Sequence, residues 1–263
     1  MHEVPDTVAI DVVLLPPGPI MDMAIGANRT LLAGNPDGGI RLDGENCLPH
    51  ISVAMLPTKR GDIPEITAKV GRIARQCSPM AMTIDAVAKH RARTGETISV
   101  FHILRSEILQ LFHKTVMNAI APYTAPPAGP LMFVGEVSAP SIDCLLRFTK
   151  TSAYERYSPH ITLGFGDLPE LIPGIDFPVR FEATRAAICH LGSHCTCQQG
   201  DPPLSRRATA AALSRTAWCR VHTRSSGRSY RSPGPRPPGT RPASGGRTPG
   251  PAPPSPAETP RAA

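Results

Sequence analysis

The chain has 263 residues, of which 41 % are hydrophobic, and carries a formal net charge of +7. Residues 201–263 contain 11 Arg, no Lys and two acids, so this segment carries +9 and residues 1–200 carry −2. The slightly acidic body is long enough to bury a core of its own, and its charge argues against a broad surface for long RNA. The first apolar run, Val8–Leu15, contains Asp11 and ends at Pro16, so it is too short to span a bilayer.

The Arg-rich segment differs from the body in more than charge. It has 13 of the 31 prolines, one Val and two Leu, and neither Ile nor Phe. Such a composition cannot bury enough apolar surface to offset the entropy of ordering, so we predict a folded domain over 1–199 and a disordered tail over 200–263. The tail is open to three interpretations: a solvated extension without function, an Arg-rich contact to nucleic acid or an acidic membrane, or GC-rich DNA read in an unselected frame.

Strand-like and helix-like patterns alternate along the first half of the body. Apolar periodicity and the positions of Pro and Gly predict these elements. In chain order they are a buried strand at 8–15, a helix of about 15 residues that begins at Pro19, an apolar strand at 48–56 ended by Pro57, a helix from Asp62 or Pro64 to about Gln76, strands at 80–87 and 97–103, and a helix to about Ala121 in which Ile103, Leu104, Ile108, Leu111 and Met117 repeat at helical spacing.

The second half begins after a proline-rich connection, Pro122–Pro130, which we expect to separate two halves of the fold. We predict a strand at 131–137, a helix at 138–149 with Ser138 as its cap, a strand at 160–165, and one or two further strands within 177–189. Interleaved strands and helices of this kind place the chain in the α/β or α+β class, and we take α+β.

One heptapeptide pattern occurs twice, in two strand-like runs 110 residues apart. Residues 49–55 read Pro-His-Ile-Ser-Val-Ala-Met and residues 159–165 read Pro-His-Ile-Thr-Leu-Gly-Phe. Side chains at i and i+2 of a strand point to the same face. We therefore expect His50 to project with Ser52, and His160 with Thr162.

These two pairs are the candidate catalytic residues. If they face each other, the hydroxyls can hydrogen-bond the non-bridging oxygens of a phosphate ester. One imidazole can take a proton from water while the other protonates the leaving oxygen, because the unperturbed pKa of histidine lies near neutrality. This chemistry needs no metal, and we predict neither a metal nor another cofactor.

The paired motifs resemble those of the 2H phosphoesterase superfamily, and in particular its 2′-5′ RNA ligase and cyclic phosphodiesterase branch. The likeness covers roughly residues 6–190, including an opening strand that ends at Pro16 and is followed by a helix. It implies a bilobal fold of two curved antiparallel sheets with outer helices, related by a pseudo-two-fold axis, with the site between them. Ser52 stands where Thr is common in the superfamily, and the hydroxyl is retained.

The resemblance also implies an activity on 2′,3′-cyclic phosphates or 2′-5′ linkages, in RNA ends or small nucleotides. Two other functions stay open: a phosphoesterase for a small metabolite without any RNA role, and a non-catalytic RNA- or nucleotide-binding module on the same fold. Binding alone does not require a matched acid–base pair, which argues against the module. The −2 charge of the body favours a small substrate over long RNA.

Basic and aromatic residues near the two motifs are candidates for substrate binding. Lys59 follows the first motif, and Arg156 and Tyr157 precede the second, where they could hold a nucleotide phosphate or stack a base. An ordinary loop surface is an equal interpretation for each. A third His-x-Thr sequence, at His113, lies on a predicted helix, where i and i+2 diverge, so we assign His113 to a solvated helix face.

The seven cysteines are an odd number without a regular disulfide framework, so we expect thiols in a soluble, cytoplasmic protein. We also expect the protein to be a monomer. The segment from Cys189 to Cys197 is dense in Cys and His. It is either a small structural zinc site or, as its tight spacing favours, the end of the last strand with free or buried thiols.

Overall fold

The computed structural model describes residues 6–37, 39–92 and 95–198, which all belong to one compact unit. The predicted disordered tail lies outside the described residues. The elements are β1 (Thr7–Leu15), α1 (Gly18–Gly34), β2 (Cys47–Leu48), β3 (Ile51–Lys59), η1 (Arg60–Asp62), α2 (Ile63–Cys77), β4 (Met80–Arg91), β5 (Thr97–Ile103), α3 (Glu107–Ile120), η2 (Ala121–Tyr123), η3 (Gly129–Met132), α4 (Ala139–Thr151), η4 (Tyr154–Arg156), β6 (His160–Phe165), β7 (Val179–Ala183), β8 (Arg185–Leu191), η5 (Ser193–Cys195) and β9 (Cys197–Gln198).

The described strands form one antiparallel sheet in the order β2-β9-β8-β1-β3-β6-β5-β4-β7. Its middle is weakly joined, because β3 and β6 share a single register pair, Ile51 with Ile161. The sheet therefore has two parts, β2-β9-β8-β1-β3 and β6-β5-β4-β7. The predicted combination of helices with antiparallel strands is confirmed.

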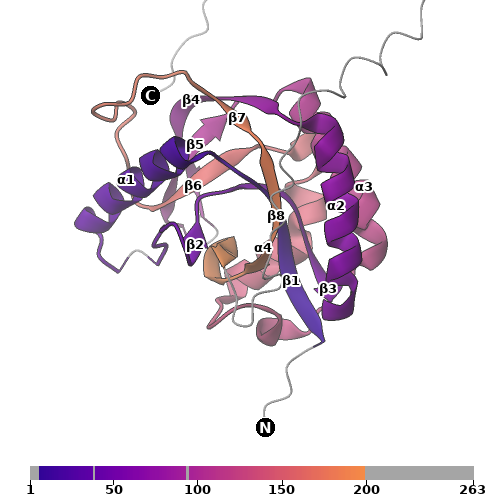
Figure 1. The fold of residues 1–263 in the computed structure, drawn as a ribbon. Coiled ribbons are helices and arrows are strands. Elements are labelled where there is room, and N and C mark those ends of the chain that lie inside the picture. Colours follow the sequence, from indigo (N-terminus) through magenta and orange to yellow (C-terminus); the bar gives the residue numbers. More distant parts are fainter. Residues whose placement is uncertain (1–5, 38, 93–94, 199–263) are drawn as a thin grey trace, which may run out of the picture. The chain divides into compact units, whose positions relative to one another are not determined.

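Helices cover the sheet in two groups (Figure 1). α2 and α3 lie side by side and contact β8 and β3, whereas α4 also contacts β3 and α1 packs on β6. β1 lies in the middle of this arrangement, and every residue of it after Thr7 is buried. β1, which lies between β8 and β3, is thus packed on both faces, which explains its nearly continuous apolar sequence.

The apolar repeat predicted for the helix α3 is buried only in part: Ile103 and Met117 are buried, and the other three members are exposed. Leu104, Ile108 and Leu111 are 49 %, 40 % and 54 % exposed. Apolar residues occupy more than one face of this helix, so spacing alone did not show which face meets β3. The buried side chains of the helix are Leu109, Phe112, His113, Val116, Met117 and Ile120.

The predicted strand at 48–56 is divided and extended. It breaks at Pro49 and His50 into β2 and β3, and β3 then continues through Pro57 to Lys59. Proline lacks a backbone donor and is tolerated where no neighbouring strand needs one. The carbonyl of Pro57 accepts a bond from the Ala125 N–H at 2.9 Å, on the side away from β1, so the missing donor costs no bond to β1.

The strand predicted at 131–137 is absent from the described structure. The chain forms η3 and then bends, with Gly129 and Gly135 at φ of 71° and 68°. A positive φ interrupts an extended strand, and glycine adopts it without steric cost. Glycine near each end of this apolar stretch was the signal against a strand.

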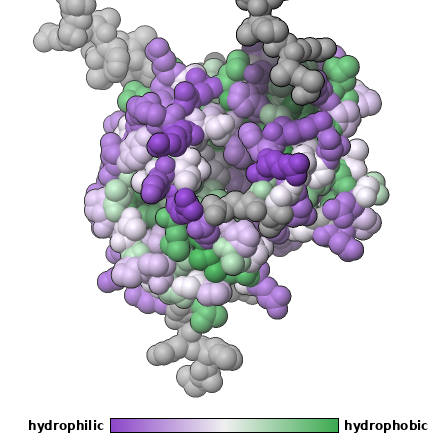
Figure 2. Space-filling model, turned by 180° about the vertical axis from the view of Figure 1, so that it is seen from behind, coloured by the Kyte–Doolittle hydropathy of each residue, from purple (hydrophilic) through white to green (hydrophobic). Residues whose placement is uncertain are grey.

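No helix within the described ranges is long and apolar enough to cross a membrane. The face of the molecule seen in Figure 2 carries mostly hydrophilic side chains, with hydrophobic ones in smaller patches between them.

Candidate active site

The two heptapeptides meet in the middle of the sheet. Ile51 of β3 faces Ile161 of β6, and both side chains are fully buried. Residues that face each other across an antiparallel pair point to the same side, and their neighbours in sequence point to the other. The histidine and the hydroxyl residue of each motif flank these isoleucines, so the structure brings all four to the opposite face of the sheet.

Each of the two imidazoles is oriented by the same kind of hydrogen bond, from its Nδ1 to a backbone carbonyl. Nδ1 of His50 lies 2.8 Å from the carbonyl oxygen of Leu48, and Nδ1 of His160 lies 2.8 Å from that of Ser158. A carbonyl only accepts hydrogen bonds, so Nδ1 carries the proton in each ring. Each motif therefore holds its histidine through the residue two positions earlier and leaves Nε2 as the nitrogen that can exchange a proton.

Burial keeps both imidazoles neutral near pH 7. It lowers the pKa of His50 to about 4, against a smaller opposite effect of the bond to Leu48, and His160 lowers this pKa further. Burial also lowers the pKa of His160, with additional contributions from the nearby His90 and His102. In the absence of an anion, both Nε2 atoms are proton acceptors.

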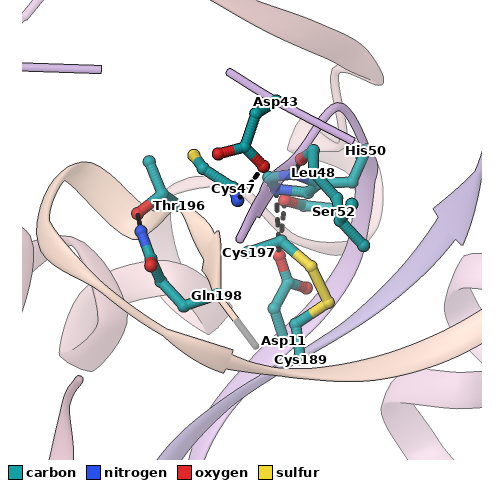
Figure 3. The surroundings of a disulfide bond; sticks show 10 residues. All are labelled: Asp11, Asp43, Cys47, Leu48, His50, Ser52, Cys189, Thr196, Cys197 and Gln198. Atoms are coloured by element: carbon teal, nitrogen blue, oxygen red, sulfur yellow. Dashed lines mark hydrogen bonds and ion pairs between the residues drawn. A yellow bond between two sulfur atoms is a disulfide. The ribbon is translucent and has the colours of Figure 1, made fainter. Parts of the chain in front are cut away.

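A buried carboxyl group that the sequence analysis did not select completes the first motif. Asp11 of β1 is fully buried, and its Oδ2 accepts a 2.6 Å bond from Ser52 Oγ and lies 3.7 Å from His50 Nε2 (Figure 3). Burial raises the pKa of Asp11 well above its usual value. The signal was present in the sequence, because an acid inside a buried apolar strand is costly unless a partner meets it.

A β-bulge makes this contact possible. Asp11 faces Met55, but the register shifts between Val12 and Val13, so Val13 faces Ser52. Without the shift Ser52 would face Leu14 and would point away from Asp11. The extra residue turns Ser52 to the face that carries Asp11, as bulges do beside many active sites.

The second motif lacks such a partner. Thr162 is half-buried, and no described residue hydrogen-bonds its hydroxyl. Ser52 Oγ, in contrast, already donates to Asp11. The two hydroxyls therefore lie in equivalent places with different surroundings.

The structure separates the three predicted substrate-binding residues. Lys59 lies at the far end of β3, where it faces Thr7, about 25 Å along the strand from the first motif, so its placement beside the motif was wrong. Arg156 is exposed at the end of η4, four residues before His160.

Tyr157, a predicted substrate-binding residue, and His113 are both buried, which corrects the assignment of His113 to a solvated helix face. Tyr157 is buried, and its hydroxyl donates to the Ser52 carbonyl at 3.0 Å. Its ring stacks on His113 at 4.0 Å between centroids. His113 is fully buried too, since α3 turns it inward, where Nδ1 donates to the Val53 carbonyl at 2.7 Å and Nε2 accepts from the Tyr154 N–H at 2.7 Å.

Cys189 and Cys197 form a disulfide, which corrects the prediction of thiols and removes both sulfurs as zinc ligands. β8 and β9 are antiparallel neighbours, so the two Cα atoms lie 5.2 Å apart, within disulfide range. Cys189 also faces Asp11 across β1 and β8, which places the disulfide beside the first motif (Figure 3). Within the described ranges, no three His, Cys, Asp or Glu side chains are grouped so as to hold a metal ion.

No protein-family model matches the chain, and no curated protein matches it. Solved structures with a similar fold include Escherichia coli LigT complexed with NADP+ (16 % identity, 70 % of this chain and 88 % of that one, TM-score 0.43) and a phosphoesterase (15 %, 70 % and 87 %, TM-score 0.42). They also include E. coli LigT complexed with 3′-AMP (14 %, 70 % and 88 %, TM-score 0.38). At these identities the similarity concerns the fold alone.

Proposed function

We propose that this chain is a metal-independent 2H phosphoesterase that acts on 2′,3′-cyclic phosphate or 2′-5′ phosphodiester bonds in RNA ends or small nucleotides. The observation that carries the proposal is the matched anchoring of His50 and His160, each through Nδ1 to a carbonyl two residues earlier. Each part of the sheet contributes one motif with the same local geometry, which supports the bilobal, pseudo-two-fold relation that the resemblance implies.

The reaction follows from two free Nε2 atoms on one face. Water attacks the phosphorus while one imidazole accepts its proton at Nε2. The bond from phosphorus to one ribose oxygen breaks, and the other imidazole, which must enter the step protonated, gives its proton to that oxygen. Both imidazoles are neutral in the empty site, so the bound phosphate anion favours the proton that this second imidazole needs.

The hydroxyls and the surrounding charge define the substrate. Thr162, and Ser52 when it turns from Asp11, can donate to the non-bridging oxygens, and the exposed Arg156 is a candidate for a further phosphate contact. The −2 charge of residues 1–200 supports a short substrate in preference to long RNA. We propose that the protein works as a monomer.

The proposal is tested with the purified protein on a panel of 2′,3′-cyclic nucleotides, short 2′-5′-linked oligomers and simple phosphate monoesters. We expect release of a nucleoside monophosphate from at least one of the first two classes, with activity retained in EDTA. His50→Ala and His160→Ala should each lower kcat by about 10²–10⁴-fold, whereas Lys59→Ala, at the far end of β3, should leave it unchanged. Loss of activity in EDTA would contradict the acid–base mechanism, and full activity in both histidine variants would contradict the site.

A further inference from the structure

Two more histidines lie next to His160 on the same face of the sheet. His102 of β5 faces His160 of β6 in the strand register, so their side chains point to the same side. The ring of His90 on β4 lies 5.8 Å from that of His160, centroid to centroid. The phosphate site therefore continues, beyond His160, into a cluster of imidazoles that the proposed mechanism does not use.

A carboxylate fixes the orientation of His102. Its Nδ1 lies 2.6 Å from Oδ1 of Asp85, and both side chains are about one third exposed. Asp85 is the extra residue at a register shift between Ile84 and Ala86 of β4, which turns its carboxylate toward β5. With Nδ1 bound to Asp85, Nε2 is the ring nitrogen of His102 that remains for a ligand.

The neighbouring residues on this face are small or have unused hydrogen-bonding capacity. Ala86 and Ala88 are small, partly exposed residues on this face of β4, opposite His102 and Val100. No described residue hydrogen-bonds His90. Both rings lie close enough to His160 to lower its pKa.

We propose that His102 and His90, with His102 oriented by Asp85, form a subsite for a second phosphoryl group of the substrate. This inference rests on the proposed function of the His50–His160 site. Adjacent strands are about 4.8 Å apart, so a group held over β5 and β4 lies roughly 5–10 Å from one held between β3 and β6. A ribose spans that distance, so the preferred substrate class is a nucleoside with a phosphoryl group at the 2′,3′ end and another at the 5′ position. A protonated imidazole whose Nδ1–H is occupied donates to such an anion through Nε2–H.

Calorimetric titration of the full chain with adenosine 3′-monophosphate and adenosine 3′,5′-bisphosphate tests the subsite. We expect the wild type to bind the bisphosphate about tenfold more tightly. His102→Gln should abolish this difference and leave the affinity for the monophosphate within about twofold. Asp85→Asn, which keeps the size of the side chain and loses its charge, should reduce the preference in part. Thermal unfolding of each variant checks that it is folded.

The subsite is overturned if the wild type binds both nucleotides equally, binds neither, or if the preference survives in His102→Gln and in Asp85→Asn. The proposed function is tested by the separate hydrolysis assay, and it is rejected if no cyclic phosphate or 2′-5′ linkage is hydrolysed. A preference for the bisphosphate that depends on His102, in a protein without that hydrolysis, would support the subsite and reject the function.

Discussion

Ser52 and Thr162 occupy matching positions but have different tasks in the folded protein. The Ser52 hydroxyl is the observed hydrogen-bond donor to the buried Asp11 carboxyl group, whose other oxygen has no partner among the described residues. No described residue uses the Thr162 hydroxyl. Loss of a donor to a buried polar group costs more than loss of a solvent-accessible one, so stability and substrate binding should respond separately at the two positions.

We therefore expect Ser52→Ala to lower the free energy of unfolding by about 1–3 kcal/mol, because it removes the Ser52 donor from the buried Asp11 carboxyl group. Thr162→Ala should change it by less than about 0.5 kcal/mol and should instead raise KM several-fold. Urea denaturation and steady-state kinetics on both variants measure the two effects. Equal losses of stability would show that the Asp11–Ser52 bond is not special, and an unchanged KM in Thr162→Ala would remove Thr162 from the site.

The buried His50 makes stability depend on pH. Its pKa of about 4 in the folded state lies below the ordinary 6.5, so the unfolded chain binds more protons between these values. Stability from this group is complete above pH 6.5 and is lost as the pH falls toward 4. The loss is on the order of 3 kcal/mol, taking about 1.4 kcal/mol per pKa unit.

His50→Gln should remove that part of the acid sensitivity. Free energies of unfolding of the wild type and of His50→Gln, measured at pH 7.5 and 4.5, give the difference directly. We expect the variant to lose less stability on acidification than the wild type, while the remaining buried histidines still contribute. Parallel pH profiles for the two proteins would mean that His50 is not desolvated as the structure indicates.

At the scale of elements, the disulfide is linked to the orientation of His50 through two short strands. It joins Cys189 of β8 to Cys197 of β9. Cys197 faces Leu48 of β2, and the Leu48 carbonyl holds His50 Nδ1. β2 and β9 have two residues each, so few other bonds hold them, and the covalent link is a main constraint on the carbonyl that orients the imidazole.

Replacing both cysteines, in Cys189→Ser/Cys197→Ser, should therefore reduce stability and activity together. The closed loop is short, and the chain-entropy relation gives about 2–3 kcal/mol for a loop of this size. Cys77→Ser, at the end of α2 and outside this group, is the control and should affect neither property. Urea denaturation and the phosphoesterase assay measure the outcome. Full activity in the double variant would show that β2 keeps its place without the disulfide.

The sequence predicted those elements whose pattern is local, and missed those that depend on packing. β6 matched its predicted bounds because Pro159 and the alternation after it are sufficient signals. The apolar repeat predicted for α3 was only partly right, because apolar residues occur on two faces of the helix, of which only one meets β3. The partnership of Asp11 with Ser52 required the bulge in β1 and β3, and the disulfide required the return of the chain through η5. Neither feature leaves a pattern in the spacing of residues.

At the scale of the whole molecule, opposite charge is divided between two stretches of the chain. Residues 201–263 carry +9, whereas residues 1–200 carry −2. The residues that form the described core lie between Val8 and Cys197, as does every residue of the candidate site. We therefore expect the first 199 residues to be sufficient for folding and for the proposed activity.

A chain that ends at residue 199 should therefore keep its cooperative unfolding and its phosphoesterase activity, within about twofold of the full chain. The full chain offers an independent probe, because Trp218 is its only tryptophan and lies outside the described residues. Arg215, Ala217 and Arg220 around it give no apolar stripe for docking on a core. We expect native Trp218 to emit at long wavelength, to be quenched readily by acrylamide, and to change little on unfolding. A blue-shifted and protected Trp218, or a truncated chain that fails to fold, would mean that the Arg-rich segment packs on the domain and takes part in its function.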